Sequence, residues 1–315
     1  MGTLIGHVAP GVGFLVIGLW HLFNNIKLHA LYPADSYTSS PWFRAPSIKY
    51  LELYLIIAGS TLSIAMELFI GPDRHQPFDP DGTIPSNHLH NFEHSSISMS
   101  LIIYAVFAIL FDRIRLKTAT HDGLAYMLAA FAFSQQFLLF HLHSADHMGV
   151  EGQYHLLLQL VILVSLITTL MGIGFPKSFL VSFVRSLSIL FQGVWFIVMG
   201  FMLWIPEFIP KGCFMNFEES HFVVRCHGDH ALHRAKSLVN LQFNWLLSMI
   251  VVFSMSMYII LNKIYGGKVE YLSINKTDEE QEKEEIQDVE LQKVFDESRS
   301  FIHIGKAMPP IDMER

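Results

Sequence analysis

Titratable residues crowd one short stretch of the chain, "HLHSADHMGVEGQYH", which runs from His141 to His155. The stretch holds four histidines and two carboxylates, and long apolar runs lie on both sides of it. Neutral imidazole is a common ligand for transition metals, and its proton affinity lies near neutral pH. A surface loop, a metal site and a proton relay are therefore three open explanations for this stretch.

Two other spacings bear on that choice. His90 and His94 lie four residues apart, as do Glu151 and His155, so each pair shares one face of a helix. Histidines at a membrane interface are often only hydrated or hydrogen-bonded, so a structural role stays open for each one taken singly. A carboxylate, Glu67, falls in another apolar run, and ionisable groups inside a membrane point to a functional site by default.

The elements that position these residues are predicted to be membrane-spanning helices. Hydrophobic residues make up 51% of the 315 residues, charged residues 16%, and the mean hydropathy is +0.38. A helix of about 20 apolar residues crosses the hydrocarbon core of a bilayer. Seven such runs are present, at Leu4–Phe23, Ile48–Ile70, Leu89–Phe111, Leu124–His141, Tyr154–Phe175, Leu180–Ile205 and Ser237–Leu261. The sequence therefore predicts an all-α fold, a polytopic bundle of seven transmembrane helices.

The distribution of basic residues predicts the orientation of this bundle, because cytoplasmic loops carry an excess of Lys and Arg. The first, third and fifth loops carry Lys27, Arg44, Lys49, Arg113, Arg115, Lys117 and Lys177. The second loop carries Arg74 and the fourth carries no basic residue. We therefore expect a lumenal or extracellular N-terminus and a cytoplasmic C-terminus, in a membrane that the sequence does not specify.

On this orientation most of the histidines gather in one layer. Thirteen of the 17 fall on the non-cytoplasmic side: His7, His75, His88, His90, His94, His141, His143, His147, His155, His221, His227, His230 and His233. Clustering of one residue type from several spans at one depth is hard to obtain from loop composition alone. The layer predicts an organised polar or metal site.

Four short motifs, in this order and spacing, carry a resemblance to a known family. They are "GHVAPG" (Gly6–Gly11), "EHSS" (Glu93–Ser96), "FLLFHLH" (Phe137–His143) and "LFQGVWF" with its trailing "GF" (Leu190–Phe201). With them the chain resembles the transmembrane protein 45 family, which includes the transmembrane epididymal proteins, over about Met1 to Leu261. The resemblance implies a seven-helix multi-pass membrane protein and no settled biochemical activity.

The resemblance also implies which polar residues matter. Carried over position by position, it favours His7, Glu52, Glu67, His94, His141, His143, His155, Gln192 and Trp195. Glu151 stands where relatives are expected to have Asp, and the linker from His143 to His155 is longer than expected. We expect Glu52, at the cytoplasmic end of the second span, to pair with Lys49 or to face water.

The sequence divides into two predicted parts, a transmembrane domain and a tail. Residues 1–267 form the predicted transmembrane domain, and residues 268–315, with "TDEEQEKEEIQDVE", form an acidic tail that we predict to be disordered and cytoplasmic. Cys213 and Cys226 lie in the sixth loop, where a disulfide and a metal site with neighbouring histidines are both open.

Three classes of function follow. The chain is a metal-dependent intramembrane hydrolase acting on a lipid, a carrier of protons or metal ions, or a membrane protein without catalysis. The metal hypothesis places one transition metal ion, zinc first, among His94, His141, His143 and His155, with Glu67 or Glu151 nearby. The lipid bilayer is the expected partner, nothing indicates nucleic-acid binding, and protein partners and homo-oligomers stay open.

Overall fold

The fold is a bundle of membrane-spanning helices, seen here in a computed structural model. The structure describes residues 3–32, 36–71, 76–114, 118–142, 149–218 and 221–304, without the side chains of 118, 119, 221 and 267–304. Within this part, seven helices are long and apolar enough to cross a membrane, so the predicted fold class is confirmed. The chain is accordingly a multi-pass membrane protein.

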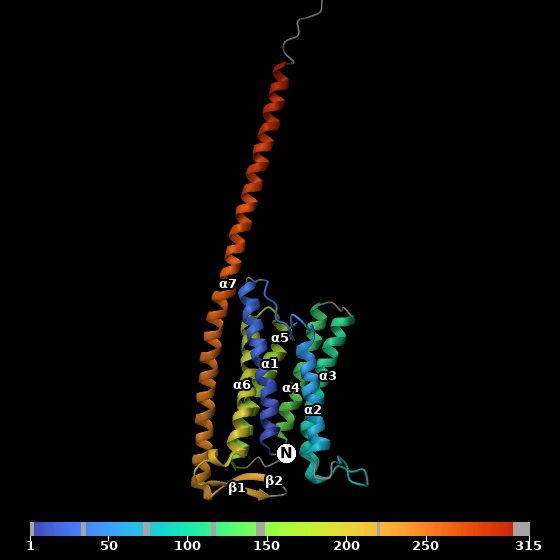
Figure 1. Cartoon of the computed structure of the whole chain (residues 1–315), viewed down its shortest axis with the longest axis vertical. Coiled ribbons are helices and arrows are strands. Elements are labelled where there is room, and N and C mark those ends of the chain that lie inside the picture. The colour runs from blue at the N-terminus through green and yellow to red at the C-terminus, as the bar shows by residue number, and fades with distance from the viewer. Residues whose placement is uncertain are drawn as a thin grey trace, which may run out of the picture. The chain divides into compact units, whose positions relative to one another are not determined.

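The elements follow one another as up-and-down helices with one hairpin (Figure 1). The bounds are α1 Leu4–Leu31, α2 Leu51–Ala65, the π-helix η1 Met66–Ile70, the 3₁₀ turn η2 Ser86–His88, α3 Leu89–Ile114, α4 Thr118–His141, α5 Gly149–Gly174, α6 Phe179–Trp204, the 3₁₀ turn η3 Pro206–Phe208, β1 Cys213–Glu218, β2 His221–Cys226 and α7 Gly228–Ile304. The hairpin and the start of α1 lie at one end of the bundle, which we call the hairpin end; the other we call the far end (Figure 1).

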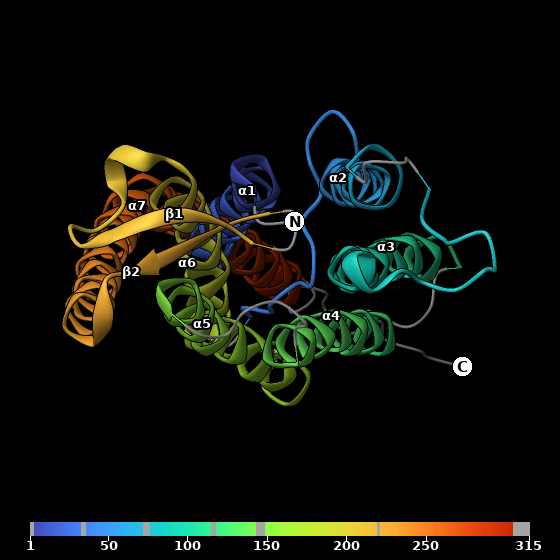
Figure 2. The ribbon, with the colours of Figure 1, turned by 90° about the horizontal axis from the view of Figure 1, so that it is seen from below.

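Six helices form a closed ring in the order α1, α6, α5, α4, α3, α2, in which each helix contacts the next (Figure 2). The spanning part of α7 packs outside this ring on α6 and α5. There Phe243 contacts the rings of Phe191 and Trp195, and Gln242 accepts a hydrogen bond from Tyr154. The outward faces are apolar, as on Trp245 and Val252 of α7, since they meet lipid instead of water.

Glycine permits the closest contact of the ring, between α1 and α6. A Cβ on Gly18 would lie 2.3 Å from the backbone nitrogen of Leu190, and one on Gly193 would lie 2.2 Å from that of Leu15. Small residues let membrane helices approach each other in this way. A Cβ on Gly13, in the same helix as Gly18, would meet no atom within 4 Å, because this residue faces outward.

The sixth loop contains a two-stranded hairpin that the hydropathy pattern did not predict. β1 and β2 pair antiparallel with Cys213 opposite Cys226, and these two cysteines form a disulfide. Of the two alternatives for this loop, the structure contains the disulfide. Glu218 and Arg225 pair across the hairpin, so this connection between two spans has a local structure of its own.

The chain divides into two compact units, Met1–Asn262 and Lys263–Arg315. The first contains the ring and the spanning part of α7. The backbone of the second unit is helical as far as Ile304, whereas the sequence predicts a disordered tail from residue 268. This segment is rich in Glu and Lys, which are strong helix formers, so a helix is locally favoured there. The domain boundary at residue 267 stays a prediction.

Candidate functional site

A buried carboxylate organises the hairpin end of the bundle. Glu67 lies in the π-helical turn that ends the second span, and its exposed fraction is 9%. The Asn91 side chain donates to Glu67 Oε2 at 2.9 Å and to the Glu67 carbonyl at 2.8 Å. The Nδ1 atom of His94 lies 3.3 Å from Oε1 of the same carboxylate. Isolated π turns inside α-helices often occur at functional sites, and this one joins α2 to α3 through a His–carboxylate pair.

Two further histidines meet at this end from α1 and α5. The rings of His7 and His155 lie edge to face with centroids 6.0 Å apart, and His7 also stacks on Trp204. Each Nδ1 lies 3.0 Å from the carbonyl oxygen four residues earlier, Thr3 for His7 and Glu151 for His155. Because a carbonyl oxygen only accepts, each Nδ1 carries a hydrogen. In the neutral ring, Nε2 is then the nitrogen that takes up a proton.

These two groups of histidines do not converge on one point. The ring of Phe140 contacts His94 at a centroid distance of 6.4 Å and stacks on His155 at 5.8 Å. Within the described ranges no three His, Cys, Asp or Glu side chains are close enough to hold a metal ion. The structure therefore pairs Glu67 with His94, and His155 with His7, at the hairpin end of the bundle.

Two of the remaining residues of the metal hypothesis, His141 and Glu151, lie within the described part of the chain. His141 is exposed at the last turn of α4. The backbone carbonyl of Glu151 accepts a hydrogen bond from His155 Nδ1. His143 lies outside the described residues, as does His147. The described residues do not fit a metal centre, and the predicted zinc site stays a prediction that depends on His143.

A second His–carboxylate pair lies at the far end, and it overturns one expectation. Glu52 is 4% exposed and accepts three hydrogen bonds: from His21 Nε2 at 2.6 Å, from the Phe43 backbone N–H at 2.9 Å, and from Trp20 Nε1 at 3.1 Å. The prediction that Glu52 pairs with Lys49 or faces water is therefore wrong. Glu52 lies in the first turn of α2 and points towards α1. There the indole of Trp20 and the imidazole of His21 donate hydrogen bonds to it in place of water.

Lys49 instead belongs to an exposed cluster on Asp112. That carboxylate accepts from Lys49, from Tyr50 at 2.6 Å and from Arg44 at 3.3 Å. The hydrogen bond to Asp112 raises the pKa of the Lys49 ammonium above its usual range. Solvent screens such exposed pairs, so this cluster contributes little to stability.

The segment of residues 37–43 folds into the far end of the bundle, and we call it the plug segment. Its Tyr37, Ser39, Trp42 and Phe43 side chains are all buried. Tyr37 donates to Asn25 of α1 at 3.0 Å. Burial raises the pKa of the Tyr37 phenol to about 12. The plug segment therefore closes the far end with its own side chains.

Other helices hold the plug segment through Arg185, Tyr104 and Tyr126. Arg185 of α6 donates to the Ser40 carbonyl at 3.1 Å, and its guanidinium lies 4.6 Å from the centre of the Tyr126 ring. Tyr104 donates to the Pro41 carbonyl at 2.8 Å, and Tyr126 donates to Ser39 Oγ at 3.0 Å. With Asn25 of α1 and Glu52 of α2, which accepts from the Phe43 backbone N–H, five helices thus fix the plug segment in place.

Sequence reasoning missed Arg185, although a signal for it was present. It is the only charged residue between Leu180 and Ile205, the predicted sixth span, and it is 3% exposed. A charge inside a membrane is costly and points to a functional site. Such a residue is more informative than any one histidine at a membrane interface.

Buried polar residues continue along α6 from Arg185 towards the hairpin end. Ser188 and Gln192 follow at spacings of three and four residues, so all three share one face of the helix. Ser188 accepts from Ser165 of α5 at 2.9 Å. Gln192, near the middle of α6, is fully buried, and neither polar atom of its side chain has a hydrogen-bond partner within the described structure. These three residues form what we call the α6 polar stripe.

One comparison with known proteins bears on this geometry. Residues 122–259 match a family of unknown function, DUF716. The match runs from α4 into the spanning part of α7 and includes Gln192 and Trp195, which the resemblance to the transmembrane protein 45 family also favours. DUF716 includes that family, so the resemblance is supported over this part of the chain. Its description assigns no activity.

Proposed function

We propose that this protein is a membrane carrier of protons, in which two buried His–carboxylate pairs bind the transported proton at the two ends of the bundle. The observation that carries the proposal is the placement of His94 with Glu67 and of His21 with Glu52, each pair joining two different helices inside the spans. Ionisable groups at such positions are expensive to bury and mark proton relays in membrane proteins.

The two pairs differ in access to water. The side chains of His94 and Glu67 are 22% and 11% exposed, whereas those of His21 and Glu52 are 5% and 3% exposed. The first pair exchanges protons with the aqueous side directly. The second lies behind the plug segment, whose Phe43 backbone N–H donates to Glu52. A proton leaving Glu52 therefore requires movement of the plug segment.

The α6 polar stripe supplies polar groups between the two pairs. Gln192 offers an amide at mid-helix without a fixed partner in the described structure, and Ser188 and Arg185 follow towards the far end. Buried polar groups normally have hydrogen-bond partners, so an unpartnered amide in the centre of a bundle calls for an explanation. A proton path explains the unpartnered amide, because the groups along such a path must exchange hydrogen-bond partners.

Two observations support the direction of transport. The basic residues of the loops favour an external hairpin end, and the disulfide between Cys213 and Cys226 suits an oxidising compartment on that side. In this orientation the accessible pair, His94 with Glu67, meets external protons. The proposal therefore has protons entering at the hairpin end and leaving past the plug segment.

The hydrolase alternative receives less support from the geometry. Ser95 and Ser96 beside His94 would suit a lipid hydrolase. Ser96 donates to the Phe92 carbonyl at 2.7 Å, whereas Ser95 is 7% exposed. Its Oγ has no hydrogen-bond partner in the described part of the chain, so no base is placed to activate it. The zinc hypothesis supplies no step here, since the described residues assemble no ligand set.

The test is proton flux into liposomes that contain the purified full-length protein and a trapped pH-sensitive dye. An imposed pH gradient should acidify wild-type liposomes faster than empty ones. Glu67→Gln and Glu52→Gln should each lower the initial rate at least tenfold, because neither amide can carry a proton. Glu207→Gln, at an exposed glutamate of η3, is the matched control and should keep the wild-type rate. Wild-type flux equal to that of empty liposomes would overturn the proposal.

A further inference from the structure

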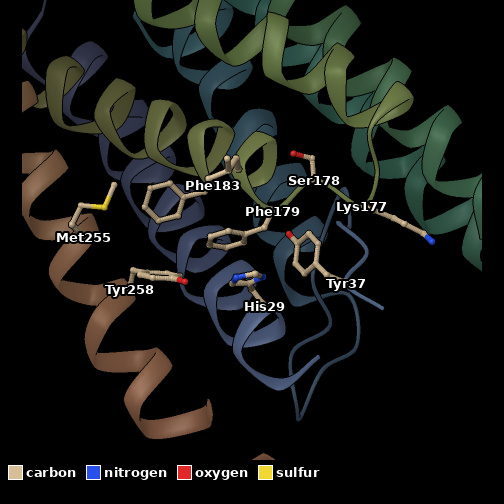
Figure 3. Close-up of a pocket in the computed structure, with 9 residues that line it drawn as sticks. His29, Tyr37, Lys177, Ser178, Phe179, Phe183, Met255 and Tyr258 are labelled. Carbon is tan, nitrogen blue, oxygen red and sulfur yellow. The ribbon is translucent and has the colours of Figure 1, made fainter. Parts of the chain in front are cut away.

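A pocket at the far end lies between α1, α6 and α7, and Tyr37 of the plug segment also lines it (Figure 3). Its volume is about 450 Å³, within the range of ligand sites in proteins. The last turn of α1 supplies His29, the start of α6 supplies Phe179, and α7 supplies Tyr258. The carrier proposed above does not use this pocket.

The walls of the pocket are aromatic and apolar. His29 stacks on Phe179 with ring centroids 3.9 Å apart and planes at 9°, and Tyr258 lies 5.6 Å from Phe179. Phe183 and Met255 extend this lining along α6 and α7 towards the middle of the spans (Figure 3). Walls of this kind accept a hydrocarbon chain and exclude a fully polar ligand.

The rim of the pocket is polar and carries positive charge without negative charge. Lys177 and Ser178 lie there, in the loop before α6, and the Lys177 ammonium points away from the aromatic floor (Figure 3). Among the described residues, no Asp or Glu lines the pocket. The Nδ1 atom of His29 is buried and has no hydrogen-bond partner among the described side chains. The ligand should therefore bring an anionic or hydrogen-bonding group to the rim.

We propose that this pocket binds one anionic membrane phospholipid, with its phosphate at Lys177 and one acyl chain along Phe183 and Met255. The position supports this occupant, because the rim lies where the spans end, at headgroup depth. Basic pockets between helices on the cytoplasmic side recognise anionic headgroups, and the loop charges favour that side for the far end. An acyl chain in the pocket would lie between α7 and the ring.

The experiment uses the full-length protein in nanodiscs and phosphatidylserine with a photo-reactive group in one acyl chain. Labelled peptides should contain Phe179–Phe183 or Met255–Tyr258. Unlabelled phosphatidylserine should compete, whereas phosphatidylcholine and inorganic phosphate should not. Labelling equally reduced by phosphatidylcholine would reveal non-selective boundary lipid, and competition by inorganic phosphate would reveal a free-anion site; either result would overturn the proposal.

Two substitutions with matched controls test the contribution of the rim and that of the acyl-chain site separately. Lys177→Ala should lower phosphatidylserine labelling about fivefold, since one basic residue near a membrane surface contributes about 1 kcal/mol to binding an anionic lipid. Lys211→Ala, at an exposed lysine of the sixth loop, should leave it unchanged. Met255→Trp should fill the pocket and abolish labelling. Met249→Trp, at a residue of α7 that is 65% exposed, should leave labelling unchanged. Unchanged labelling in both Lys177→Ala and Met255→Trp would contradict the proposal.

Discussion

Replacement of Glu52 tests the far-end pair most sharply, because Ala and Gln should have different effects. Glu52→Ala removes the acceptor of three buried donors, on Trp20, His21 and the Phe43 backbone. A buried donor without a partner costs about 1–3 kcal/mol, and hydrogen bonds between membrane helices average about 0.6 kcal/mol. Three losses at the low end of the first range give a destabilisation of about 3 kcal/mol.

Glu52→Gln should cost less. The amide oxygen can still accept from Trp20 and Phe43, which both donate to Oε2. The amide nitrogen would then face His21 Nε2, which must become an acceptor, so the hydrogen moves to His21 Nδ1. That atom is buried without a partner in the described structure, and the cost is that of one unpaired donor, about 1 kcal/mol.

Unfolding of the purified protein in mixed micelles, with increasing SDS, gives both values. Glu207→Ala and Glu207→Gln, at an exposed position, are the controls and should change stability little. If Gln proves as costly as Ala, the amide oxygen does not accept from Trp20 and the Phe43 backbone in place of Glu52 Oε2. If neither variant is destabilised, Glu52 is not bonded as described and the reasoning fails.

Four further predictions concern packing, pH, metal and orientation. Gly18→Ala should destabilise the bundle by about 2 kcal/mol or more through overpacking against α6, while Gly13→Ala should be neutral or stabilising by up to about 1 kcal/mol, as SDS unfolding will report. The raised pKa of Tyr37 contributes stability that is full below its ordinary value of 10.0 and declines as pH rises towards about 12, so Tyr37→Phe should show a smaller decline between those values. If zinc binds through His143, protein purified without chelator will contain stoichiometric zinc and His143→Ala will lose it; absence from the wild type refutes that site. The single N-x-S/T sequon, at Asn275, should stay unglycosylated in cells, and glycosidase-sensitive mass there would reverse the orientation.

The spans could be predicted from the sequence because a bilayer leaves a helix as the solution for a long apolar run. Their ends were less certain. Hydropathy ends the first span at Phe23, yet α1 continues to Leu31, and Asn25 in that extension is fully buried. Polar residues that bond to another helix look like loop residues in a hydropathy profile. Hydropathy also misses the first turns of α7, which begins at Gly228, because Asp229, His230 and His233 there are polar and exposed.

The pairing of buried polar groups could be predicted only in part. Glu67 and His94 were predicted to lie near each other because two spans bring them to the same depth. His21 and Glu52 lie 31 residues apart on neighbouring helices, and no spacing rule connects them. Local spacing favoured Lys49 as the partner of Glu52, but Lys49 lies before α2 and donates to Asp112, whereas Glu52 in the first turn of α2 meets His21 of α1. Helix rotation is set by packing, such as the contact of Gly18 with Leu190, which one sequence does not reveal.

In the proposed carrier, Glu67 and Glu52 together carry protons across the bundle. The most direct measurement is the initial rate of proton entry into liposomes under a potassium diffusion potential, negative inside, for the wild type and the Glu52→Gln/Glu67→Gln double variant. Both proteins should be reconstituted at equal density, with folding checked by size-exclusion chromatography. We expect a rate well above that of empty liposomes for the wild type and a rate equal to that of empty liposomes for the double variant. Equal, protein-dependent rates for the two proteins would contradict the proposal.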